Sequence, residues 1–90
     1  MKKAAALRYD ERRDALPRVT AQGRGKTAER IIDIAAEAEI PIIEDAALVS
    51  ALLALELGDE IPVELYRTVA KILAFLYEID KQDLKPQAKP

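Results

Sequence analysis

The sequence predicts an α/β domain in which a small mixed sheet of about three short strands packs with three helices, in the order β-β-α-β-α-α. Two short apolar runs near the start and one β-branched run in the middle indicate the strands. Apolar residues that recur with the helical period indicate the helices. Because 90 residues can bury only a modest core, we expect a single domain over residues 1–80 and a disordered tail over residues 81–90.

The first two strands are expected at residues 4–9 and 18–22, joined by a charged, solvated turn. Pro17 suits the beginning of the second strand, where its missing N–H does little harm. Gly23 and Gly25 then mark a tight turn into a helix. This part of the chain therefore predicts two strands that lead directly into the first helix.

That helix is expected from about residue 25 to Ala38, because one apolar stripe follows the i, i+3, i+4, i+7 spacing. The stripe consists of Ile31, Ile34, Ala35 and Ala38. The run Ile-Pro-Ile-Ile at residues 40–43 comes next, and its short length and β-branching favour a buried strand. A strand, a helix and a strand within about 25 residues predict a parallel βαβ crossover.

Two further helices are expected in the second half of the chain. Asp45 can cap a helix that continues to Gly58, because its carboxylate can accept hydrogen bonds from the open N–H groups of the first turn. Pro62 suits the first position of the last helix, which should continue for about 18 residues. The apolar face of this helix consists of Leu65, Val69, Ile72, Leu73, Leu76 and Ile79.

Composition and charge narrow the possible functions. The chain has no cysteine and no histidine, so thiolate chemistry, the commonest metal ligand and the commonest general base are all missing. No apolar run is long enough to span a membrane or to form a signal peptide, which predicts a cytoplasmic protein. Residues 1–30 carry a net charge of +5, residues 31–66 carry −9 with no Lys or Arg, and residues 67–90 carry +2. A basic end and an acidic end suit an oriented protein partner better than a nucleic acid, although solvated helix faces would give the same pattern.

Two motifs could carry chemistry, and each has a simpler structural interpretation. The GRGK run at residues 23–26 resembles a phosphate loop, but its glycines lack the required four-residue spacing. The acidic pairs at residues 44–45 and 59–60 precede helices, where carboxylates stabilise the positive end of the helix dipole. We therefore predict no enzymatic activity, no metal and no cofactor.

The order of these segments resembles the cytoplasmic, C-terminal domain of the FlhB/YscU family, the export-switch proteins of flagellar and injectisome type III secretion. The matching segments are ALRYD, LPRV, a GRG turn into AERI, IPIIED and, most specifically, GDEIPVELYRTVAKILAFLY. Together they cover about residues 4–79. The resemblance implies a role in protein export and in the switch of substrate specificity, through contacts with other proteins.

The resemblance also implies a difference from the family. Its members carry Asn-Pro-Thr-His just before the first of these strands and cleave themselves between the Asn and the Pro. Here Met-Lys-Lys stands at that place and the chain contains no asparagine, so we expect no autocleavage. The membrane-spanning half and the strand before the cleavage loop have no counterpart in the sequence. We therefore expect a stand-alone counterpart of the fragment that cleavage releases.

The resemblance implies that family members dock export substrates on the turn into the second strand and on the last helix. By position, this implies a partner-binding patch made of Leu16 and Pro17 together with Ala70 and Leu73. Leu16 departs from the small residue that the family has there. The structural alternatives are core packing for Ala70 and Leu73 and a plain turn at Pro17.

Three functions remain open from the sequence. The first is an accessory protein of flagellar or type III export that replaces the cleaved C-terminal fragment of FlhB beside its membrane half, at the export gate. The second is a cytosolic binder of export substrates that does not join the gate. The third is an RNA- or nucleotide-binding module that uses Arg24 and Lys26, which the acidic middle of the chain disfavours.

Overall fold

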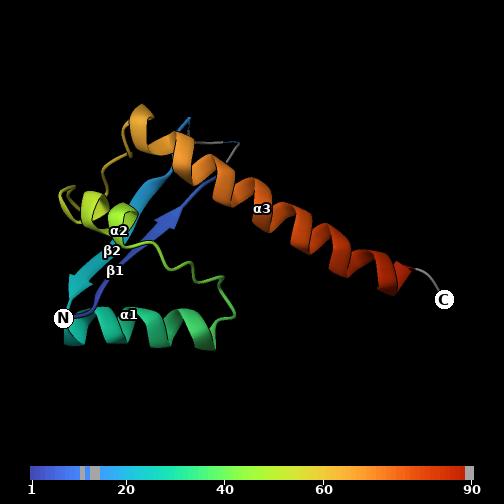
Figure 1. Ribbon diagram of the computed structural model, residues 1–90, viewed down its shortest axis with the longest axis horizontal. Helices are drawn as coiled ribbons and strands as arrows, with labels where there is room; N and C mark the ends of the chain where they lie inside the picture. The colour runs from blue at the N-terminus through green and yellow to red at the C-terminus, as the bar shows by residue number, and fades with distance from the viewer. Residues whose placement is uncertain (11, 13–14, 89–90) are drawn as a thin grey trace.

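The structure, a computed structural model, describes residues 1–10, 12 and 15–88. It contains two strands followed by three helices: β1 (Lys3–Arg8), β2 (Arg18–Arg24), α1 (Lys26–Glu37), α2 (Ala46–Leu53) and α3 (Val63–Ala88). Figure 1 shows the strands crossing between α1 and α2, with the later part of α3 extending away from the body of the domain. The predicted mixed α/β fold is confirmed.

The sheet consists of β1 and β2, paired antiparallel. Lys3 lies opposite Arg24 and Leu7 lies opposite Val19. The register shifts between Ala6 and Leu7, because Thr20 has no partner of its own on β1. The Thr20 hydroxyl donates a hydrogen bond to the Ala6 carbonyl oxygen at 3.3 Å, next to this β-bulge. Both α1 and α2 pack against the two strands.

The predicted third strand at residues 40–43 is wrong, and so is the parallel βαβ crossover. Within the described residues the sheet has two strands, and residues 40–45 form an irregular connection from α1 to α2. The exposed fractions of Ile40, Ile42 and Ile43 are 55%, 45% and 44%. The described part of the chain provides no neighbouring strand for this run, so its β-branched side chains stay largely exposed.

Helix α1 ends in a tight backbone turn that the sequence does not predict. The Ile40 N–H donates to the Ala35 carbonyl oxygen at 2.9 Å, and the Glu39 N–H donates to the Ala36 carbonyl oxygen at 3.1 Å. These two bonds define a Schellman motif, whose left-handed position is usually glycine. Here that position is Glu39, with φ 58°, so a side chain occupies a conformation that disfavours one.

The turn from β2 into α1 explains both glycines of the GRG segment. Gly25 precedes the helix with φ 60° and ψ −127°, a conformation that residues with a side chain rarely adopt. A Cβ atom on Gly23 would overlap the side chain of Thr27, one turn into α1. Gly23 therefore allows the strand and the helix to approach each other closely.

The later helices begin where the sequence predicts and end elsewhere. The Asp45 carboxylate accepts a hydrogen bond from the Leu48 N–H at 3.0 Å, which confirms it as the cap of α2. This helix stops at Leu53, before the expected end near Gly58. Helix α3 begins directly after Pro62 and continues to Ala88, past the expected end near residue 79. Disorder of residues 81–90 in solution stays a prediction.

The core is small and lies where the sheet, α2 and α3 meet. Its buried cluster consists of Val19, Leu52, Ile61 and Val69. Partly buried side chains pack around the cluster: Ala5, Leu7, Leu48, Leu55, Leu65, Tyr66 and Leu73. Aliphatic residues therefore dominate the core, as the low aromatic content predicts.

We predict that Glu39→Gly raises the free energy of unfolding, by up to about 1 kcal/mol, because glycine adopts the left-handed conformation without strain. Urea unfolding of the variant and the parent measures the change. As a control, Ala36→Gly places glycine at an exposed position inside α1 and should lower stability by about 1 kcal/mol. A loss of stability in both variants would contradict the strain at Glu39.

Candidate functional site

The four residues of the predicted partner-binding patch lie at the boundary of the core. Pro17 is fully buried, whereas Leu16, Ala70 and Leu73 are half-buried. Leu73 packs against the buried cluster that contains Val19, two residues beyond Pro17. The patch as a docking surface stays a prediction, and its accessible members are Leu16, Ala70 and Leu73.

Pro17 is buried because a second segment runs along the start of β2. This LGDEI segment, residues 57–61, follows α2 and leads into α3. The Ile61 N–H donates to the Pro17 carbonyl oxygen at 2.9 Å, and both side chains are almost completely buried. Pro17 has no N–H to donate, so the beginning of the strand loses no hydrogen bond by having proline there.

The LGDEI segment extends the backbone pairing beyond the two named strands. The Val19 N–H donates to the Asp59 carbonyl oxygen at 3.0 Å, and the Gly58 N–H donates to the Val19 carbonyl oxygen at 2.8 Å. Arg18 and Glu60 form an isolated antiparallel bridge between the Ile61–Pro17 bond and the Val19–Asp59 bond. The start of β2 is therefore held on both sides, by β1 and by the LGDEI segment.

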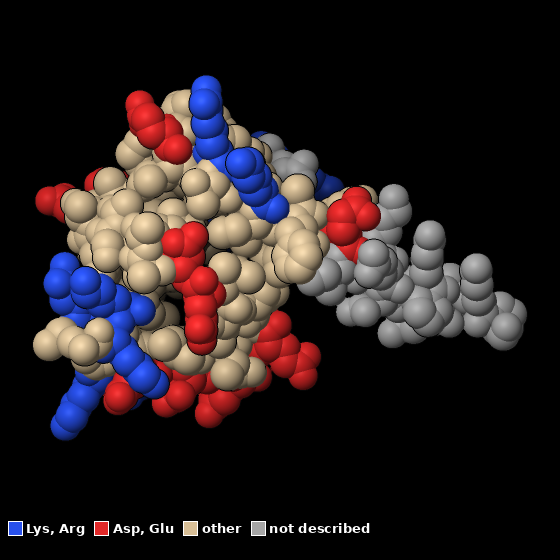
Figure 2. Space-filling model, in the orientation of Figure 1, with Lys and Arg blue, Asp and Glu red and all other residues tan. Residues whose placement is uncertain are grey.

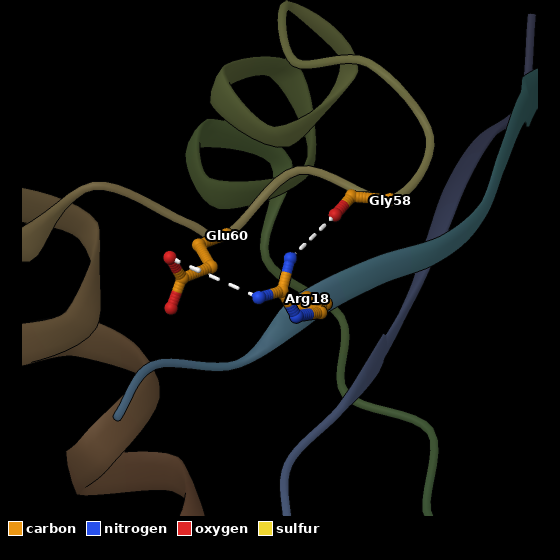
Figure 3. Close-up of polar contacts among 3 residues, drawn as sticks. All are labelled: Arg18, Gly58 and Glu60. Carbon is orange, nitrogen blue, oxygen red and sulfur yellow. Dashed lines mark hydrogen bonds and ion pairs between the residues drawn. The ribbon is translucent and has the colours of Figure 1, made fainter. Parts of the chain in front are cut away.

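Arg18 adds a side-chain contact to this pairing, as Figure 3 shows. Its guanidinium donates a hydrogen bond to the Gly58 carbonyl oxygen at 3.0 Å. A second nitrogen of the same group lies 4.0 Å from a carboxylate oxygen of Glu60. Both side chains are close to half exposed, so solvent weakens the ion pair and the hydrogen bond is the stronger of the two contacts.

An aromatic contact joins the same end of the sheet to α3. The rings of Tyr9, directly after β1, and Tyr66, in the first turns of α3, have centroids 6.3 Å apart and are tilted by 48°. Tyr66 also packs against the buried cluster, whereas Tyr77 is 66% exposed. The two tyrosines of α3 therefore differ: one holds the helix to the sheet and the other faces solvent.

The acidic pairs that could have served catalysis take part in backbone structure. Asp45 caps α2, and the Asp59 carboxylate accepts a hydrogen bond from the Glu56 N–H at 3.0 Å. In the part of the chain that the structure describes, no group of acidic residues is arranged to hold a metal ion. These contacts support the structural interpretation of both pairs.

The GRGK turn does not form a phosphate cradle. The Gly25 N–H already donates to the Lys2 carbonyl oxygen at 2.8 Å, so it is not available to an anion. Arg24 and Lys26 are exposed on either side of it. The geometry supports the interpretation that these glycines serve the strand-to-helix turn.

The sequence did not predict that the start of β2, including Arg18, pairs with the LGDEI segment. One signal was present, because a residue before proline favours the extended conformation and Ile61 precedes Pro62. An apolar residue in an extended segment beside a glycine is consistent with a short strand. The pairing partner, some 40 residues away, could not be identified from that signal alone.

We predict that Arg18→Ala lowers the free energy of unfolding by about 1 kcal/mol, because the Gly58 carbonyl oxygen loses a charge-assisted hydrogen bond. The matched variant Glu60→Gln removes the ion pair alone and should cost less than about 0.5 kcal/mol. Urea unfolding of both variants provides the measurement. Equal losses would mean that the ion pair, and not the bond to the carbonyl, fixes Arg18.

The comparisons with known proteins agree with the resemblance drawn from the sequence. The sequence model of the FlhB HrpN YscU SpaS family matches residues 1–76. YlqH of Bacillus subtilis is 47% identical over 81 residues, covering 90% of this chain and 87% of YlqH. The flagellar biosynthetic protein FlhB of Escherichia coli is 38% identical over 88 residues, covering 97% of this chain and 23% of FlhB. The chain thus spans about a quarter of the length of this FlhB relative.

Solved structures give the same result for the fold. The PscU C-terminal domain superimposes with a TM-score of 0.77 at 32% identity, covering 82% of this chain and 95% of that domain. A mutated EscU/SpaS C-terminal domain superimposes with a TM-score of 0.79 at 28% identity, covering 84% and 95%. Among the described residues, no helix has the length and apolar character that crossing a membrane requires. From its sequence and its fold, the chain belongs to the FlhB HrpN YscU SpaS family.

Proposed function

We propose that this chain acts in flagellar or type III protein export as a stand-in for the cleaved C-terminal fragment of FlhB. The observation that carries the proposal is the pattern of coverage. The chain covers 23% of FlhB of Escherichia coli and 95% of the PscU C-terminal domain. The part of the family that it matches is thus the C-terminal domain.

The mechanism that we propose is non-covalent. The domain docks beside a membrane-embedded FlhB at the cytoplasmic face of the export apparatus and presents its surface to export-gate components or export substrates. The charge distribution along the chain would orient it, with +5 over residues 1–30 and −9 over residues 31–66. Figure 2 shows basic side chains near the N-terminal end and over the top, and acidic side chains along the lower edge, in the middle and at the upper left of the view. A contact-based role requires no catalytic group, and the structural use of Asp45 and Asp59 fits that requirement.

Within this proposal, the substrate-facing patch consists of the accessible members of the predicted set. Leu16, Ala70 and Leu73 are half-buried and offer apolar surface beside the core. Pro17 contributes indirectly, since its carbonyl oxygen fixes the LGDEI segment and its ring is buried. Substitutions at Leu16 and Ala70, which are not among the residues packed against the buried cluster, should therefore alter binding more than they alter the fold.

A second candidate function is a cytosolic binder of export substrates that does not join the gate. The observation that favours it is the exposure of large apolar side chains on α3, with Phe75 at 60% and Tyr77 at 66%. Such side chains suit the capture of another apolar helix. The identity of the bound proteins separates the two functions.

We predict that the affinity-tagged chain co-purifies with export-gate proteins and restores motility to cells whose FlhB is truncated at the cleavage site. Ala70→Glu should weaken both results, because it places a charge in the patch. The matched control Ala74→Glu, one turn along α3 at an exposed position, should leave them unchanged. Co-purification of hook or rod proteins without gate proteins would favour the second candidate. Failure of both co-purification and rescue would contradict both candidates.

We predict that Leu73→Ala lowers the free energy of unfolding by about 1–3 kcal/mol, below the range for a completely buried leucine, because Leu73 packs against the cluster but is half-buried. Phe75→Ala, at a 60% exposed position, is the control and should change stability little. Thermal or urea unfolding measures both. A negligible loss for Leu73→Ala together with weaker partner binding would assign Leu73 to the docking surface alone.

A further inference from the structure

We propose that one end of the domain binds an anionic lipid surface through a basic patch made of four exposed residues. The members of the basic patch are Lys2, Lys3, Arg24 and Lys26. The inference goes beyond the proposed function, because it concerns lipid headgroups and not an export protein. It depends on how the backbone holds these cations together and on what surrounds them.

The strand register places two of these cations next to each other. Lys3 of β1 lies directly opposite Arg24 of β2. The Gly25 N–H donates to the Lys2 carbonyl oxygen at 2.8 Å, one residue outside this pair on both strands. That bond makes Lys3 and Arg24 a non-hydrogen-bonded pair, the kind in which opposite side chains lie closest. Like charges directly opposite each other repel and weaken the pairing of the strands.

The other two cations flank this pair. Lys2 precedes Lys3 in the chain, and Lys26 begins α1 directly after Gly25. Figure 2 shows basic side chains gathered at the N-terminal end of the view. A cluster of four or more Lys and Arg side chains on one surface is typical of segments that bind anionic lipid.

No acidic side chain offsets this charge by a direct contact within the described part of the chain. None of the four cations forms an ion pair with a described acidic residue. Glu29 lies in the first turn of α1, but it too has no ion pair with a described basic residue. The repulsion between Lys3 and Arg24 is therefore not relieved by a salt bridge inside the described domain, and an external anion would relieve it.

The positions of the aromatic residues disfavour a nucleic acid as that anion. Proteins that bind single strands place aromatic rings beside the cations, so that bases stack on the rings. Tyr9 follows the opposite end of β1, and Tyr66, Phe75 and Tyr77 belong to α3. The basic patch therefore provides charge without a stacking surface, which is sufficient for headgroup phosphates.

Met1 favours a lipid surface over an acidic protein segment. Its side chain is 95% exposed, and its Cγ atom would lie 3.9 Å from a Cβ atom on Gly25, inside the basic patch. An exposed apolar side chain among cations suits the boundary between headgroups and acyl chains. The net charge of −9 over residues 31–66 would turn the rest of the domain away from an anionic membrane.

The experiment measures binding of the full chain to lipid vesicles by cosedimentation. We expect binding to vesicles of equal parts phosphatidylglycerol and phosphatidylcholine, no binding to phosphatidylcholine alone, and a steep loss of binding as the salt concentration rises. Equal binding to both kinds of vesicle, or binding that salt does not weaken, would overturn the proposal. Single-stranded RNA or polyglutamate that binds as tightly as the mixed vesicles would overturn the assignment to lipid.

One substitution should change vesicle binding and stability in opposite directions. Lys3→Glu should weaken binding to the mixed vesicles by about tenfold, because it replaces an attractive charge with a repulsive one. It should also raise the urea midpoint of unfolding, because an opposite-charge pair with Arg24 replaces a like-charge pair. Unchanged vesicle binding or a lower midpoint would contradict the role of this pair.

The matched control is Lys71→Glu, which changes the net charge equally at an exposed position on α3. It should leave vesicle binding unchanged, and a loss equal to that of Lys3→Glu would mean that net charge, not the basic patch, drives binding. Purified lipid contains no export protein, so the result is separable from that of the proposed function. Vesicle binding with failed co-purification and failed rescue would support the lipid site and overturn the export function, and the reverse pattern would do the opposite.

Discussion

The backbone pairing between the start of β2 and the LGDEI segment is the constraint on which the rest of the structure depends. Three hydrogen bonds, from Ile61, Val19 and Gly58, join the end of the α2 connection to the strand. They place Ile61 beside Val19 in the buried cluster, and Leu52 and Val69 complete that cluster from α2 and α3. Without this pairing, α3 would be joined to the rest of the domain mainly by two contacts. These are the Tyr9–Tyr66 ring contact and the packing of α3 on α2.

The same pairing explains the arrangement of the candidate site. Pro17 and Leu73 belong to elements far apart in the sequence, and the cluster around Val19 connects them. Ile61 and Pro17 are both buried and are joined by a backbone hydrogen bond, so Pro17 lies next to the segment that leads into α3.

Sequence patterns predicted the features that depend on local chemistry. The Asp45 cap, the GRG turn and the beginning of α3 after Pro62 follow from residues within one turn of each other. The strand predicted at residues 40–43 is wrong because a strand requires a neighbouring strand, and the described part of the chain supplies none for this run. The end of α1 was placed within one residue, although Glu39 occupies a position that usually carries glycine. For the site, the resemblance to the family supplied Leu16, Pro17, Ala70 and Leu73. Pro17 pairs with the distant LGDEI segment, and Leu73 packs against the cluster that contains Ile61 of that segment, which periodicity does not detect.

These features together describe a small domain whose half-buried apolar patch suits contact with other proteins. The measurement that tests this account most directly is cryo-electron microscopy of export gates from cells in which FlhB ends at the cleavage site and this chain is supplied separately. The account predicts density for the domain at the cytoplasmic end of the gate, beside the truncated FlhB. Gates that assemble and export without any such density would contradict it.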